Sequence, residues 1–289
     1  MTQTDSPVKI VTDSSVHLPP LERQKHDITV VPLKAIFGQT VYRDEIDLTN
    51  QQFYDMLPNA EVHPTTSQPS AGEFMEVYKP LLDAGREIVS LHLPSKLSGT
   101  YASACAAKTE LETQLKKALP LSIVDTPWVS MALGMLVLAA AEAAEAGKSR
   151  EEILATINAL IPKLNLIFVL DTLEYLKRGG RIGGARAMLG TLLNVKPMLE
   201  IKHGQVEPLE QPRSRAKALK RLLEIMDERT CHKPVHASIL HAVCPTDAAE
   251  MEKELCERFQ VKEFYMTEIG AVIGVHTGPN ALGIAFYTD

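Results

Sequence analysis

The sequence predicts an α/β protein made of two α/β domains, and two observations support this class. Short apolar, β-branched runs alternate with longer helical patterns through the first half of the chain, which is typical of βαβ units around a mainly parallel sheet. A chain of 289 residues is also long enough for two domains of ordinary size. We expect an N-terminal α/β domain over residues 1–163 and a smaller, mixed α/β domain over residues 164–289.

The alternation of the two patterns gives the elements of the first domain in order. Strands are expected at residues 8–11, 28–31, 88–93 and 121–124. Helices are expected near residues 19–24 and at 50–57, 71–84, 101–118 and 129–146. Gly85 and Gly147 directly follow two of these helices, where a left-handed residue commonly ends a helix.

The pattern changes after Pro162, and the second domain is expected to contain a hairpin. His203-Gly204 resembles a hairpin turn between two β-rich runs. The other elements are read from the same periodicities. They are strands at 166–170, 195–201, 206–211, 235–241, 263–269 and 282–287, a helix through Tyr175 before the glycine-rich break at 179–184, and helices at 213–228 and 247–259.

Charge and composition exclude several classes of function. A net charge of -6 argues against a nucleic-acid binder, which needs a broad basic surface. The longest uncharged apolar run, residues 131–141, is much shorter than the roughly 20 residues that span a bilayer, and the N-terminal residues do not resemble a secretory signal. The four cysteines and nine histidines have no metal-ligand spacing. We therefore expect a cytoplasmic protein with no membrane insertion and no metal.

The stretch SKLSGTYASA, residues 95–104, lies between an expected strand and an expected helix, and three roles are open for Ser98. A serine nucleophile in a G-x-S-x-G elbow would need a small residue where Lys96 stands. Backbone amides at a helix start, with the hydroxyls of Ser98 and Thr100 beside Gly99, would favour a bound anion. A plain helix cap would need no ligand.

A second hydroxyl-rich segment, residues 63–70 (HPTTSQPS), also precedes a helix. Ser70 and Glu73 form a capping box, but Thr66 and Ser67 lie upstream and are not needed for it. Because the carboxyl ends of parallel strands meet at one edge, the two segments are expected to face one crevice.

A third segment, residues 274–280 (GVHTGPN), is expected to be a turn between two apolar strands. The turn would expose His276, and its glycines would let the backbone approach another group closely. An exposed histidine without a ligand is the alternative for this segment.

Five motifs in sequence order make the chain resemble the DegV family of fatty-acid-binding proteins, which serve bacterial fatty acid kinases. Each motif alone is weak, but their order from about residue 8 to the end is specific. The motifs are VTDSS (11–15), TSQP (66–69), LSGTY (97–101), LEYLKRGGRI (173–182) and GVHTGP (274–279). The resemblance implies a DegV-like two-domain α/β fold.

The resemblance also implies a ligand, a long-chain fatty acid such as palmitate buried in an apolar tunnel, with no other cofactor. By position, Thr66 and Ser98 look like the residues that bind its carboxylate, and His276 resembles a histidine near the same group. Ser67, Gly99 and Thr100 adjoin them in the motifs, and Asp13, Ser14 and Ser15 are expected to line the crevice.

A basic segment gives the resemblance a second consequence. Residues 177–221 carry a charge of +8 within a chain of -6, which a solvated helix face would also explain. In the family, arginines at these places belong to the kinase-docking surface, so Arg181 and either Arg213 or Arg215 are the candidates. The chain departs from the family at Gly183, often serine, and at Asn280, often glycine.

The leading hypothesis is a non-enzymatic carrier that presents the carboxylate of a bound fatty acid to a separate fatty acid kinase, which forms the acyl phosphate. The chain itself has no P-loop or kinase signature. The rival hypothesis is an acyl hydrolase with Ser98 as nucleophile, His276 as base and Asp13 as the third member.

Overall fold

The computed structural model describes residues 6–191 and 195–289, which form two compact units. The first unit contains residues up to Lys34 and Ser67–Pro162, and the second contains Ala35–Thr66 and Lys163–Asp289. The second unit thus includes residues 35–66, which were expected in the first domain. Their place follows from long-range contacts that no local pattern reveals: the hydroxyl of Tyr54 donates to the Ile269 carbonyl at 3.0 Å.

The first unit is built on a four-stranded parallel sheet in the order β2-β1-β6-β7. Val11 of β1 lies between Thr29 of β2 and Ser90 of β6 in the register of the sheet. Parallel strands need crossover connections, which the intervening helices supply. The strands are β1 (Val8–Asp13), β2 (Thr29–Val31), β6 (Glu87–His92) and β7 (Leu121–Asp125).

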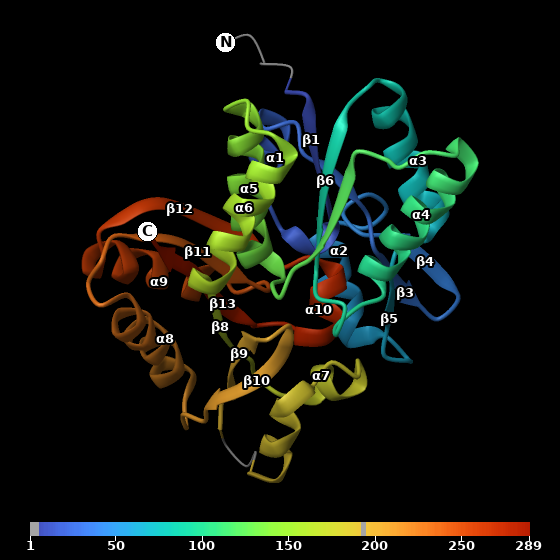
Figure 1. Cartoon of the computed structure of the whole chain (residues 1–289). Helices are drawn as coiled ribbons and strands as arrows, with labels where there is room; N and C mark the ends of the chain where they lie inside the picture. The colour runs from blue at the N-terminus through green and yellow to red at the C-terminus, as the bar shows by residue number, and fades with distance from the viewer. Residues whose placement is uncertain (1–5, 192–194) are drawn as a thin grey trace. The chain divides into compact units, whose positions relative to one another are not determined.

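Helices cover both faces of this sheet. Figure 1 shows α5 and α6 along one side of β1 and β6, and α3 and α4 along the other. Phe74, Tyr78 and Leu111 from the α3 and α4 side are fully buried against Val11 and Ile88 of the strands. The helices are α1 (Pro20–Lys25), α3 (Ala71–Asp83), α4 (Thr100–Leu115), α5 (Ser130–Glu145) and α6 (Arg150–Leu160), with short 3₁₀ turns at Ser14–Val16 and Ile161–Lys163.

The second unit is built on a six-stranded mixed sheet in the order β10-β9-β8-β13-β11-β12. Of the neighbouring pairs, β11 and β12 run parallel and the others run antiparallel. The strands are β8 (Asn165–Val169), β9 (Met198–Lys202), β10 (Gln205–Glu210), β11 (Val235–His241), β12 (Val261–Glu268) and β13 (Leu282–Thr288). A three-stranded sheet, β4-β3-β5, joins β3 (Lys34–Phe37), β4 (Thr40–Arg43) and β5 (Thr65–Ser67).

Two groups of helices accompany the six-stranded sheet. Helices α8 (Arg215–Thr230) and α9 (Pro245–Arg258) pack their apolar sides on it, where Leu222, Met226 and Leu255 are buried against strand residues such as Ile284. The shorter helices α2 (Asn50–Met56), α7 (Glu174–Arg178) and α10 (Ala271–Thr277) pack together, α10 against both others. Short 3₁₀ segments lie at Leu57–Asn59 and Gly183–Thr191.

The expected α/β class and mixed second sheet are confirmed, and several local expectations are corrected. The hairpin turn at His203-Gly204 is present, with positive φ angles of 51° and 74°. The expected turn at residues 274–280 is wrong, because residues up to Thr277 form helix α10. Helix α6 and the short strands β3 to β5 were not expected from the sequence.

Candidate functional site

The structure brings together two of the expected site residues, Thr66 and His276. Thr66 lies in β5, and His276 lies in the last turn of α10. Their side chains form a hydrogen bond with 3.1 Å between Thr66 Oγ1 and His276 Nε2. The two residues are 210 positions apart, so only the fold makes this pair.

Glycines place α10 close to its neighbours and hold His276 in position. A Cβ atom on Gly179, just after α7, would lie 2.1 Å from His276 Nδ1. A Cβ atom on Gly278 would lie 2.4 Å from Cδ2 of Tyr175, and the positive φ of 72° there also favours glycine. A close approach was expected of the glycines in residues 274–280, and Gly278 indeed approaches Tyr175, while Gly274 approaches Phe53 and Tyr54.

The environment of His276 keeps its imidazole neutral at pH 7. Surrounding protein lowers its pKa to about 3, and the charges of Arg181 and His63 act in the same direction. Arg181 donates from Nη1 to the Gly179 carbonyl at 2.8 Å. A guanidinium therefore lies within electrostatic range of His276, although Arg181 was expected at a partner surface.

His63 and Tyr175 belong to the same cluster and were missed as site residues. Their ring centroids are 5.8 Å apart, and burial lowers the pKa of His63. His63 Nε2 and His276 Nδ1 are both buried without a hydrogen-bond partner among the described residues. The signal for His63 was its place two residues before the hydroxyl-rich residues 65–67.

The Ser98 segment lies in the first unit, between β6 and α4. Gly99 is the N-cap of α4, so the structure contradicts the plain helix cap among the three roles that were open for Ser98. Ser98 Oγ lies 2.9 Å from Thr100 Oγ1 and accepts from the Thr100 amide at 3.3 Å. Gln68 lies against Gly99, since a Cβ there would be 3.0 Å from Gln68 Nε2. The segments that start at Ser67 and Ser98 therefore lie side by side in this unit.

Asp13 and the serines that follow it are buried and bonded within the first unit. The carboxylate of Asp13 accepts from the amide and hydroxyl of Ser15, from the Leu93 amide and from His92. Ser14 Oγ accepts from the Leu33 amide at 3.0 Å. Asp13 thus orients His92, a different histidine from the one that the hydrolase hypothesis required.

The structure distinguishes the two arginines at the start of α8. Arg213 is exposed and has no ion-pair partner among residues 6–191 and 195–289. Arg215 is largely covered and donates to Asp247 at 2.5 Å and to the Asn280 carbonyl at 2.7 Å, with Asp171 3.6 Å away. Asn280 adopts a φ of 60° and also donates to Asp171 at 2.9 Å, which explains how it replaces glycine.

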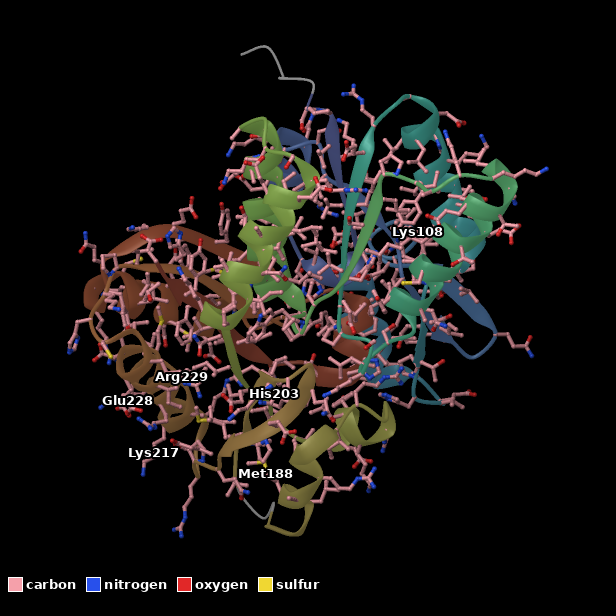
Figure 2. The ribbon with its side chains drawn as sticks, viewed as in Figure 1. Lys108, Met188, His203, Lys217, Glu228 and Arg229 are labelled. Atoms are coloured by element: carbon pink, nitrogen blue, oxygen red, sulfur yellow. The ribbon has the colours of Figure 1, made fainter. Side chains whose placement is uncertain are left out.

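Much of the basic segment is neutralised locally. Arg221 contacts Glu210 and Glu228, Arg178 contacts Glu174, and Lys196 contacts Asp171. Lys217 extends from α8 on the same helix as Glu228 and Arg229 (Figure 2), and its side chain is exposed. Because acidic neighbours offset several of its basic side chains, the segment produces a weaker positive potential than its charge of +8 suggests.

Two wider features of the described residues bear on function. They contain no group of three or more histidine, cysteine, aspartate or glutamate side chains arranged to hold a metal ion. Over the same residues, each helix is too short or too polar to cross a membrane.

Comparisons with known proteins agree in family and fold. Residues 7–289 match the DegV family, described as uncharacterised proteins. A DegV domain-containing protein of Streptomyces coelicolor is 38% identical over 279 residues, covering 96% of this chain and 97% of its own. The structure of a DegV family protein from Thermus thermophilus, described by its fatty acid binding, has a TM-score of 0.91 at 37% identity and covers 98% and 99% of the two chains.

A second solved structure carries the same description. DegV of Bacillus subtilis, described as a fatty acid binding protein, has a TM-score of 0.87 at 34% identity, with coverage of 99% of this chain and 100% of its own. The five ordered motifs, the two-unit α/β fold and these similarities lead to one conclusion: the chain belongs to the DegV family.

Proposed function

We propose that this protein binds one long-chain fatty acid and presents its carboxylate to a separate, ATP-dependent fatty acid kinase in the cytoplasm. The observation that carries the proposal is the hydrogen bond between Thr66 and a neutral His276. Solved relatives described as fatty acid binding supply the ligand class. In this proposal Thr66 and Ser98 donate to the carboxylate, and the acyl tail fills an apolar tunnel.

The acyl tail would supply most of the affinity. Burial of about 14 methylenes contributes on the order of 11 kcal/mol before the costs of association, which remove several kcal/mol. Hydroxyl donors satisfy a carboxylate without an imidazolium ion pair, since His276 is neutral. A carboxylate held in this way stays available to attack a phosphoryl group.

The hydrolase hypothesis has no geometric support. Asp13 is committed to His92, and His276 Nδ1 has no carboxylate partner within the described residues. A hydrolase base needs such an orienting group on its second nitrogen.

Extraction of the purified protein tests the proposal. We expect organic solvent to release an unaltered long-chain fatty acid at about one per chain, and added palmitate to raise the melting temperature of delipidated protein. A lipid-free extract together with an unchanged melting temperature would contradict fatty acid binding. Turnover of p-nitrophenyl esters that is lost in Ser98→Ala would favour the hydrolase instead.

A further inference from the structure

The hydrogen bond between Thr66 and His276 can be made in two ways, and they differ in what Thr66 offers a ligand. A neutral imidazole carries its proton on one ring nitrogen and accepts on the other. If Nε2 carries the proton, it donates to Thr66 Oγ1 and leaves the threonine proton free. If Nδ1 carries it, Thr66 must donate its only proton to Nε2 and can no longer donate to a ligand.

The surroundings of Nδ1 distinguish these two states. Nδ1 is buried without a hydrogen-bond partner among the described residues, and it faces Gly179, where a Cβ would lie 2.1 Å away. The Gly179 carbonyl already accepts from Arg181, and the Gly179 amide already donates to the Tyr175 carbonyl at 2.9 Å. A proton on Nδ1 would therefore be a buried donor with no acceptor, whereas a bare nitrogen would leave a lone pair unpaired, and unpaired buried acceptors are more common in proteins than unpaired buried N–H groups.

We propose that His276 is held as the Nε2–H tautomer, and that Gly179 acts as the positioning residue, because its missing Cβ leaves room for the ring where Nδ1 has no hydrogen-bond acceptor in the described part of the chain. The chain of donors then runs outward, from His276 Nε2 to Thr66 and from the Thr66 hydroxyl to a ligand. Each bond in such a chain polarises the next one. This inference rests on the proposed function for the identity of the ligand, but the tautomer is a property of the protein alone.

The outward direction decides which head group fits at Thr66. A hydroxyl whose proton is free can donate to an ionised carboxylate, which only accepts. A hydroxyl whose proton is used by Nε2 could only accept, so it would favour a fatty amide or alcohol. The Nε2–H tautomer of His276 thereby lets Thr66 donate to an ionised carboxylate, and a bond to this charged acceptor is stronger than a bond to the oxygen of a neutral analogue.

The first experiment measures the tautomer directly. Two-bond ¹⁵N–¹H correlation spectra of ¹⁵N-histidine-labelled, full-length protein identify the protonated nitrogen of each ring, and His276 is assigned by the signals missing in His276→Gln. We expect the Nε2–H pattern at pH 7 without fatty acid. An Nδ1–H pattern overturns the proposal whether or not the protein binds fatty acid.

The second experiment separates the two nitrogens by substitution. In His276→Gln the amide reaches the Nε2 position and still donates to Thr66, whereas in His276→Asn it reaches only the Nδ1 position. We expect His276→Gln to keep most of the affinity for palmitate and His276→Asn to lose about tenfold or more. The parent should also prefer palmitate to palmitamide.

The outcomes distinguish this inference from the proposed function. An Nε2–H tautomer with no palmitate binding by the parent would overturn the function and leave the tautomer standing. An Nε2–H tautomer with equal palmitate affinities in both variants would overturn the outward donor chain. If a variant does not fold, the spectrum of the parent still decides the tautomer.

Discussion

The carboxylate of Asp13 and the imidazole of His92 form a fully buried hydrogen bond, with 2.9 Å between Oδ2 and Nδ1. Two further hydrogen bonds extend this pair: His92 Nε2 lies 2.8 Å from Ser90 Oγ, and Ser90 Oγ lies 2.8 Å from the Tyr78 hydroxyl. A carboxylate only accepts, so Nδ1 donates; with a neutral imidazole, Ser90 donates to Nε2 and Tyr78 donates to Ser90. The arrangement has the residue types of a catalytic triad, but Ser90 is fully buried.

The direction of these bonds predicts an order of stabilities. Tyr78→Phe removes one donor and leaves no buried donor without an acceptor, so it should cost about 1 kcal/mol of unfolding free energy. Ser90→Ala leaves Tyr78 without an acceptor and should cost about 2–3 kcal/mol. Asp13→Ala removes the acceptor of His92, the Leu93 amide and Ser15, so it should cost the most unfolding free energy, about 3–5 kcal/mol. Urea denaturation measures the order, and equal losses for all three would contradict it.

The fold class was predictable because periodicity and helix caps are local. Ser70 and Glu73 make the expected capping box, with the Ser70 amide 2.8 Å from the Glu73 carboxylate. Helix α10 was missed because Gly274 and Gly278 are typical of turns, although here Gly274 gives space to the side chains of Phe53 and Tyr54. The pairing of Asp13 with His92 was missed because it joins two neighbouring strands, which sequence spacing does not reveal.

Thr66 and Ser98 should matter for affinity, whereas their neighbour Thr65 should not. Thr66→Val and Ser98→Ala should each weaken palmitate binding by about 1.5–3 kcal/mol, because a charge-assisted bond is lost. Thr65→Val is the matched control, since Thr65 is exposed and adjacent residues of a strand point to opposite faces. Calorimetry of delipidated protein measures all three. Parent-like affinity in both test variants would remove the head-group assignment.

Gly179→Ala should disturb His276 more than its size suggests. The new methyl group would lie 2.1 Å from Nδ1, so the ring must move and its bond to Thr66 should break. We expect the His276 signals to shift and palmitate binding to weaken by about tenfold or more. Gly72→Ala is the control, because its nearest neighbour, Ser70 Oγ, would be 3.8 Å from the new Cβ atom. Parent-like spectra of Gly179→Ala would contradict the close packing.

Arg213 and Arg215 should separate partner binding from stability. Arg213→Glu should change the unfolding free energy by no more than about 0.5 kcal/mol and slow phosphorylation of bound fatty acid at low salt, because exposed charges act on the encounter rate. Arg215→Ala should instead cost about 1–3 kcal/mol of stability, since Asp247 and the Asn280 carbonyl lose their donor. An unchanged phosphorylation rate in Arg213→Glu would exclude it from the docking surface.

Arg181 is a less selective probe of docking than Arg213. It donates to the Gly179 carbonyl and lowers the pKa of His276, so Arg181→Glu should alter fatty acid binding as well as phosphorylation. For each variant, a kinase assay measures the loss of phosphorylation rate and calorimetry measures the loss of palmitate affinity. The loss of rate relative to the loss of affinity should be larger for Arg213→Glu than for Arg181→Glu. Palmitate affinity unchanged in Arg181→Glu would place Arg181 at the partner surface alone.

Two histidines should make the folded protein sensitive to mild acid. Burial lowers the pKa of His17 to about 4, and surrounding protein lowers that of His276 to about 3, both below the value of about 6.5 in an unfolded chain. The unfolded state therefore binds these protons first, and the stability that the neutral rings contribute is fully present above about pH 6.5. It is lost as pH falls toward the folded values, by up to about 1.4 kcal/mol per pH unit for each histidine.

Between about pH 6.5 and 5.5 most carboxylates remain ionised, so urea denaturation in this window isolates the histidines. The combined variant His17→Asn, His276→Gln should show a clearly shallower loss of unfolding free energy than the parent, and an equally steep loss would mean that neither ring is held neutral by the fold.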